Sequence, residues 1–174
     1  MPRSGPRVSG LKFMSPFVLD LSRLSQGSSQ ISLEVDAPEL GLPAAGWPGR
    51  VLGDIRVERN GERITVRGRV RAAAWLECFR CLRGFELTLD VPFEVFAEKS
   101  GKGSHRDEVE LERDDYMMFH DGRKLDLSGQ VREALLLELP IAPHCRENCE
   151  GLCPKCGADL NDGPCACPDR IAVR

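Results

Sequence analysis

Alternating apolar and polar residues predict β-strands over the first half of this 174-residue chain. PFVLDLSRL (16–24) and SQISLEVDA (29–37) have the length and pattern of short strands. The segment 38–50 that follows is rich in proline and glycine, which predicts an irregular loop. Residues 1–15 are rich in arginine, serine, glycine and proline, and we expect them to be a disordered N-terminus.

Residues 50–71 carry the clearest local signal, a β-hairpin. Two alternating runs flank Asn60-Gly61. Asn-Gly is the strongest short hairpin signal, because both central residues of a type I′ turn have positive φ. With this two-residue loop, Val57 lies opposite Ile64 on an apolar face, and the second strand continues toward Cys78.

The second half of the chain predicts one more long strand and a single helix. FELTLDVPFEVF (85–96) alternates again, with its apolar residues on one face. LDLSGQVREALLLELP then predicts a helix over 127–139, because Asp126 or Ser128 can cap its start and Pro140 prevents its continuation.

These elements predict an α+β fold. We expect an antiparallel β-sheet, open or closed into a barrel, with one packed helix and a cysteine-rich tail of the zinc-knuckle type. The expected domains are a β domain over 16–140 and a zinc-binding tail over 141–174, after the N-terminal segment.

Charge is unevenly distributed along the chain. The net charge is −3, with nine arginines against four acidic residues in segment 50–83 and an acidic excess after it. This balance argues against a nucleic-acid grip over the whole surface, but it gives the molecule distinct faces. No apolar stretch approaches the roughly 20 residues that span a bilayer, and no signal peptide is recognisable, so we expect a cytoplasmic protein without membrane contact.

The arginines of segment 50–83 are candidate RNA contacts. The alternative is a solvated strand face with cross-strand ion pairs, and the predicted register supplies two of them, Glu58–Arg63 and Asp54–Arg67. The less neutralised arginines, and therefore the candidates for RNA or partner binding, are Arg69, Arg71, Arg80 and Arg83. Three aromatic residues nearby could stack on bases, although packing in the core is favoured for them: Trp75, Phe79 and Phe85.

Eight cysteines form two groups along the chain. The first group is Cys78 and Cys81 in CFRC, and the second is Cys145 with the run CEGLCPKCGADLNDGPCAC at 149–167. In a reducing compartment this spacing indicates metal rather than disulfide bonds. CxxC alone could also be a redox pair, but such a pair belongs at a strand-to-helix junction, whereas CFRC lies between two strand-like runs.

Zinc is the metal that such a set of thiolates predicts, because it prefers four soft ligands in a tetrahedron. One expected site is Cys153, Cys156, Cys165 and Cys167. The second expected site, which would join the tail to the sheet, is Cys78, Cys81, Cys145 and Cys149. Two alternatives stay open: a single zinc with spare thiols, and His144 in place of Cys145. Thiolates fill both sites and leave no open position, so the zinc would be structural.

No catalytic constellation is recognisable. The sequence contains no H-E-x-x-H, P-loop, G-x-S-x-G or dinucleotide-binding motif. Its histidines are scattered, and its paired acidic residues lie in charged segments that read as solvated loops. We therefore expect no enzymatic activity and no small-molecule substrate.

Three motifs together resemble the YceD family of large ribosomal RNA subunit accumulation proteins. They are CFRCL at 78–82, EALLLELP at 133–140 and CEGLCPKCGADLN at 149–161, and the opening FVLD at 17–20 also looks like that family's first strand. The resemblance implies a bacterial or plastid protein that promotes accumulation or processing of large-subunit (23S) ribosomal RNA, with no known enzymatic activity. It implies precursor large-subunit RNA, a large-subunit ribosomal protein, or both as partners.

Two functions are therefore in competition. The first is a non-enzymatic ribosome-biogenesis factor in which structural zinc fixes the tail against the basic segment. The second is a zinc-ribbon module that binds proteins and does not contact RNA directly, which the low aromatic content of 6% and the negative net charge favour.

Overall fold

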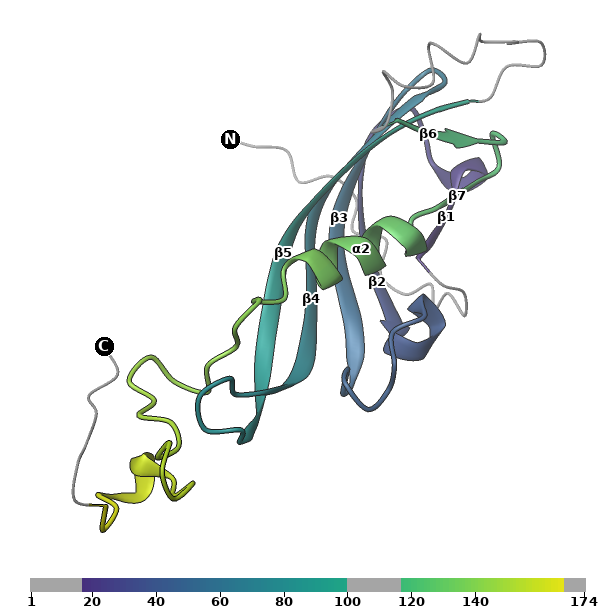
Figure 1. The fold of residues 1–174 in the computed structure, drawn as a ribbon. Coiled ribbons are helices and arrows are strands. Elements are labelled where there is room, and N and C mark those ends of the chain that lie inside the picture. The colour runs from purple at the N-terminus through teal and green to yellow at the C-terminus, as the bar shows by residue number, and fades with distance from the viewer. Residues whose placement is uncertain (1–16, 100–116, 168–174) are drawn as a thin grey trace, which may run out of the picture.

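A five-stranded sheet forms the body of the protein (Figure 1). The structure, a computed structural model, describes residues 17–99 and 117–167, so the predicted N-terminal disorder lies outside the described residues. The strands are hydrogen-bonded in the order β2-β3-β4-β5-β6. Their bounds are β2 Gly27–Asp36, β3 Arg50–Asn60, β4 Arg63–Glu77, β5 Gly84–Lys99 and β6 Met117–His120.

The sheet is open and mixed, so the antiparallel sheet is confirmed only in part and closure into a barrel is wrong. β2 to β5 form an antiparallel meander, whereas β6 pairs with the end of β5 in the parallel direction. Parallel neighbours need a connection of about a dozen residues or more, and residues 100–116 are long enough to provide one. Within the described residues β2 and β6 do not pair, and the sheet stays open.

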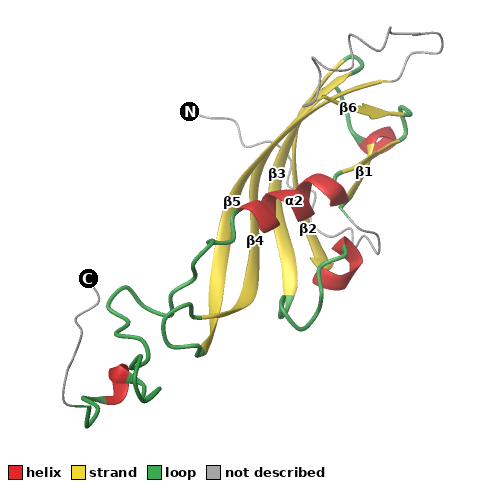
Figure 2. Ribbon diagram, viewed as in Figure 1, coloured by secondary structure: helices red, strands yellow, loops and turns green. Residues whose placement is uncertain are grey.

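Shorter elements cover one face of this sheet (Figure 2). β1 (Val18–Asp20) pairs antiparallel with β7 (Lys124–Asp126) as a separate two-stranded sheet. The helix α2 (Ser128–Leu137) follows, where the sequence predicted one. Its N-cap residue is Leu127, which forms no side-chain cap, so neither predicted cap, Asp126 or Ser128, occupies that position. The Asp126 carboxylate, one residue earlier, accepts the Ser128 backbone N–H at 2.9 Å.

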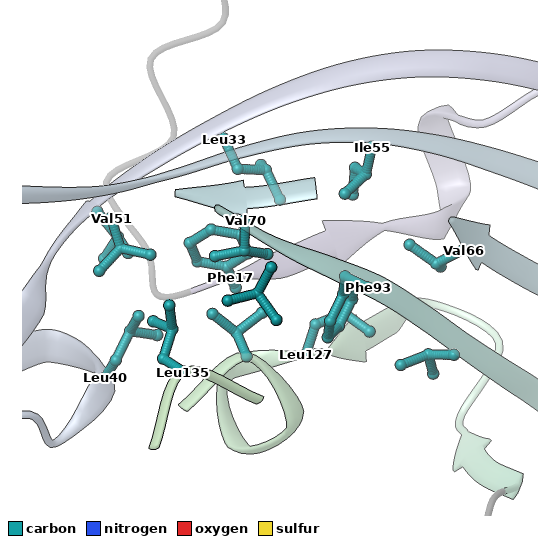
Figure 3. Packing of buried hydrophobic residues seen from close by; sticks show 14 of the residues in the cluster. Phe17, Leu33, Leu40, Val51, Ile55, Val66, Val70, Phe93, Leu127 and Leu135 are labelled. Carbon is teal, nitrogen blue, oxygen red and sulfur yellow. The ribbon is translucent and has the colours of Figure 1, made fainter. Parts of the chain in front are cut away.

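The hydrophobic core lies between α2 and the sheet (Figure 3). Val131 and Leu135 of α2 are fully buried, and Phe17, Val70 and Phe93 lie in the same cluster. Burying side chains of this size contributes about 1.5–3 kcal/mol each, before the entropic cost of ordering the chain. The opposite face of the sheet carries polar side chains and faces solvent, because residues alternate between the two faces of each strand.

The β3–β4 turn differs from the predicted one by one residue. Asn60 pairs with Arg63, so the loop is Gly61-Glu62 instead of Asn60-Gly61. Gly61 has a φ of 67° and is the one residue of this turn with positive φ. That is the pattern of a type II′ turn, which places glycine at the first central position.

The hairpin register changes with the turn. Val57 lies opposite Val66, so the predicted pairing with Ile64 is wrong. Because the shift is two residues and side chains alternate with a period of two, the predicted apolar face is still the buried one. The predicted ion pair between Asp54 and Arg67 is lost in this register.

Candidate metal centres

Four cysteines from two distant segments meet at one end of the sheet. Cys78 and Cys81 lie in the turn between β4 and β5, and Cys145 and Cys149 lie in the tail. The Sγ atoms of Cys78 and Cys149 are 3.8 Å apart, and those of Cys81 and Cys145 are 3.7 Å apart. Cys78 and Cys149 are only 0% and 2% exposed. We call this group the bridging site, because it joins the tail to the sheet.

The other four cysteines lie together within the tail. Cys153, Cys156, Cys165 and Cys167 form this group, which we call the tail site. The Sγ atom of Cys153 lies 3.5 Å from that of Cys165 and 4.0 Å from that of Cys167. In the Cys153-Pro-Lys-Cys156 turn, the Gly157 N–H donates to the Cys153 carbonyl at 2.8 Å, and Gly157 has a φ of 73°. Glycine adopts this left-handed conformation without a Cβ clash.

The sulfur spacing fits a zinc ion with four thiolates. A tetrahedron with Zn–S bonds of about 2.3 Å has edges of about 3.8 Å, and within each group all four ligand atoms lie within 4.8 Å of one another. A disulfide would need an S–S distance of about 2.05 Å, and all eight cysteines are free. The grouping is the one that the spacing suggested, whereas occupation by metal stays a prediction. His144 belongs to neither group.

Without a cation, electrostatics oppose ionisation of all four cysteines in either group. Burial opposes ionisation of Cys78, but backbone N–H groups donating to its sulfur lower its pKa to about 6. Backbone N–H groups of the knuckle turn likewise lower the pKa of Cys153 to about 6. Burial and neighbouring cysteines raise the pKa of Cys145 to about 12, and neighbouring cysteines and burial do the same for Cys167. Four thiolates at these distances are stable only around a cation, since like charges otherwise keep some thiols protonated.

A polar network supports the bridging site, and sequence reasoning missed it. The Asn161 amide donates to the Cys149 sulfur at 3.4 Å and to the Asp159 carboxylate at 2.7 Å. Its oxygen accepts from Arg146 at 2.6 Å. Asp159 also receives a hydrogen bond from Arg83, which lies beyond Cys81, at 2.6 Å. Such hydrogen bonds orient metal ligands and stabilise their charge. The sequence signal was the DLN segment at 159–161, whose role spacing alone did not reveal.

The arginines expected to be poorly neutralised mostly have carboxylate partners. Arg69 pairs with Asp90 at 2.7 Å, and Arg71 pairs with Asp54. Because of these ion pairs, the premise that singled out Arg69 and Arg71 is wrong.

The remaining two candidate arginines lie in the turn of the bridging site. Arg83 pairs with Asp159 and Asp162 at 2.6 and 3.1 Å. Arg80 has no carboxylate partner among the described residues, and its guanidinium donates to the Cys149 carbonyl at 2.9 Å. Arg80 is therefore the candidate whose charge is least neutralised.

Two of the three aromatic residues do not pack in the core, contrary to expectation. Trp75 is 53% exposed and Phe79 is 72% exposed, whereas Phe85 is partly buried against the bridging site. Trp75 points to solvent because it shares the outward face of β4 with the arginines. Within the described residues, no helix is both long and apolar enough to cross a bilayer.

Comparison with known proteins gives one family match and several relatives. The family described as large ribosomal RNA subunit accumulation protein YceD matches residues 66–172. An uncharacterized protein of Mycobacterium leprae is 33% identical over 165 residues, which cover 91% of this chain and 74% of that protein. An uncharacterized protein of Mycobacterium tuberculosis is 34% identical over 157 residues, covering 86% of this chain and 73% of that protein.

A plant relative carries a functional name. It is the large ribosomal RNA subunit accumulation protein YCED homolog 1, chloroplastic, of Zea mays, which is 31% identical over 144 residues. These residues cover 69% of this chain and 49% of the maize protein. No solved structure matches the chain.

Proposed function

The chain belongs to the YceD family of large ribosomal RNA subunit accumulation proteins, and on this premise we propose that it is a non-enzymatic, cytoplasmic ribosome-biogenesis factor. It promotes accumulation or processing of large-subunit (23S) ribosomal RNA. Its partner is precursor large-subunit RNA, a large-subunit ribosomal protein, or both. The name of the maize relative supports this role.

Two structural zinc ions are part of the proposal. The observation that carries it is the pair of four-cysteine groups whose spacing fits closed tetrahedral sites. The zinc of the bridging site would fix the tail (141–174) against the β domain (16–140), with the Asp159–Asn161 network aligning its ligands. Zinc held by four thiolates supplies folding energy and has no open position for chemistry.

Direct RNA binding by Arg69, Arg71, Arg80 and Arg83 remains a proposal, and Arg80 is the first residue to test. RNA phosphates would have to displace carboxylates from the other three arginines, at the expense of charge-assisted hydrogen bonds. These ion pairs favour the second candidate, a zinc-ribbon module that acts through a protein and does not contact RNA directly.

A deletion strain tests the role in ribosome biogenesis. We expect a lower ratio of mature 23S to 16S RNA in cells that lack the gene, and recovery with the wild-type protein but not with a Cys78→Ser variant. An unchanged ratio in the deletion strain would refute the proposed role. Purification with and without nuclease, compared between wild type and Arg80→Ala, tests direct RNA contact. Binding through phosphate contacts should weaken steeply between about 50 and 200 mM salt.

A further inference from the structure

Two apolar side chains project into solvent from the turn that holds the bridging site. Phe79 is 72% exposed and Leu82 is 57% exposed, although Cys78 and Cys81 beside them are buried. We call Phe79 and Leu82 the knuckle tip. In Figure 1 this turn, between β4 and β5, lies with the tail at the end of the sheet remote from β6. Exposed apolar groups that gather in one place often mark a surface where another molecule binds.

The backbone conformation at Leu82 is one that favours glycine, so local folding does not explain why a leucine occupies this position. Leu82 has a φ of 58°, and among the described residues it is the one non-glycine with positive φ. Its N–H donates to the Cys78 carbonyl at 2.9 Å, as the Gly157 N–H donates to the Cys153 carbonyl at 2.8 Å. The two residues thus occupy equivalent positions in the two knuckle turns.

The equivalent positions hold different residues, and the difference is informative. Glycine suits the left-handed conformation, whereas a residue with a Cβ is strained in it. Leu82 does not recover this cost by burial, because more than half of its side chain is exposed. Strained residues of this kind cluster at binding sites, which makes the Leu82 side chain a candidate for contact with a partner.

The charges around the knuckle tip identify the chemistry of that partner. Glu77 precedes Cys78, and Glu147 and Glu150 flank Cys149. These exposed carboxylates have no ion pair among the described residues. Of the nearby arginines, Arg83 is paired with two aspartates, whereas Arg80 and Arg146 bond only to neutral oxygens and so offset two of these three carboxylates. Unpaired carboxylates repel RNA phosphates and attract a basic polypeptide.

We propose that the knuckle tip, together with the exposed Trp75, docks a basic protein segment that carries an apolar anchor residue. Phenylalanine, tryptophan and arginine are enriched in the centre of protein interfaces, and the unpaired carboxylates would form a complementary polar rim. The inference rests on the proposed function, under which the segment belongs to a large-subunit ribosomal protein. It extends that function by locating the surface and stating the chemistry of its ligand.

A Leu82→Gly variant separates binding from folding. It places the residue of the second knuckle in the first, so we expect an unchanged or higher melting temperature and unchanged zinc content. The matched control is Phe119→Ser, which removes an exposed apolar side chain from β6, at the other end of the sheet. The full-length proteins are immobilised and offered two probes separately: ribosomal proteins extracted from the large subunit, and protein-free 23S RNA.

We expect the wild type and Phe119→Ser to retain a basic ribosomal protein, identified by mass spectrometry, and Leu82→Gly to retain at least tenfold less of it. Equal retention by Leu82→Gly and the wild type would overturn the inference. Retention of RNA alone would also overturn the inference and would favour a knuckle tip whose Phe79 stacks on RNA bases. The 23S to 16S ratio of the deletion strain is measured independently. A result that refutes the proposed function can therefore be distinguished from one that refutes docking at the knuckle tip.

Discussion

Replacement of Cys149 by serine should detach the tail from the sheet, whereas replacement of Cys167 should not. Cys149 belongs to the bridging site, which connects segments 71 residues apart, from Cys78 to Cys149. Cys167 belongs to the tail site, which closes only 14 residues, from Cys153 to Cys167. We expect each variant to bind one zinc ion per chain instead of two.

The difference in loop length sets the difference in stability. A cross-link removes chain entropy from the unfolded state by a constant amount plus an amount that grows with the logarithm of the loop length. This relation gives about 4.4 kcal/mol for the longer loop and about 3.0 kcal/mol for the shorter one. Loss of the bridging site should therefore lower the free energy of unfolding by about 1.4 kcal/mol more than loss of the tail site.

Amide hydrogen exchange can follow the two sites separately. The Phe79 N–H donates to the Pro143 carbonyl at 2.7 Å, and the Leu152 N–H donates to the Arg80 carbonyl at 3.1 Å. Both bonds connect the knuckle to the tail, so Cys149→Ser should expose these amides to exchange. The Cys153 N–H, which donates to the Ala158 carbonyl within the tail, should lose protection in Cys167→Ser instead.

Two results would refute this reasoning. One is a Cys149→Ser protein that still binds two zinc ions, because the assignment of ligands would then be incorrect. The other is unchanged protection of the Phe79 and Leu152 amides in a protein that has lost one ion, because the metal would then not hold the tail in place.

Three further predictions concern single residues. Gly68→Ala should lower the free energy of unfolding by at least about 2 kcal/mol, since an added Cβ would lie 2.1 Å from a backbone oxygen of the neighbouring strand. Gly129 lies on α2 in open space, so Gly129→Ala should raise the free energy of unfolding by about 0.4–1 kcal/mol. Thermal melts of both variants measure these changes. Backbone N–H groups, that of Lys124 first, lower the pKa of Asp121. Its stabilising contribution is therefore present at neutral pH and is lost as the pH falls through the folded pKa. An NMR titration of its carboxyl carbon should show an inflection below the ordinary value of about 3.9, and an inflection at or above that value would contradict the assignment. Asn161→Ala should speed zinc release from the bridging site to a chelator by roughly tenfold, with the tail site unaffected; equal rates in wild type and variant would show that the Asn161 amide does not support the site.

Local patterns predicted much of the fold, and long-range pairing explains the errors. Alternation identified the strands because each strand has one buried and one solvated face. The Asn-Gly signal failed by one residue because Gly61 alone supplies the positive φ of the observed turn. The parallel β5–β6 pair has no local signature, since it depends on a connection of many residues.

The candidate site shows the same division. Cysteine spacing and an even count of eight were enough to suggest two groups of four. The partner of Arg69 was missed because Asp90 lies on β5, beside β4. The partner of Arg71 was missed because Asp54 comes within its reach only in the observed β3–β4 register. Exposure of Trp75 was available from the sequence, because it has the same parity along β4 as Arg67 and Arg71. The left-handed backbone at Leu82 could not be predicted from the sequence, since it follows from closing a knuckle turn around the cysteines.

The span of the bridging site also fixes an order of assembly. The meander β2–β5 joins neighbours in sequence, so its contacts can form while the ribosome is still adding residues beyond β5. Cys78 and Cys81 are then held at the tip of a finished hairpin, with only half of their metal ligands. Cys145 and Cys149 are synthesised later, so the group is complete only after they have emerged. Zinc capture at the proposed bridging site would therefore follow folding of the sheet, and an occupied site would mark a chain whose tail has already docked.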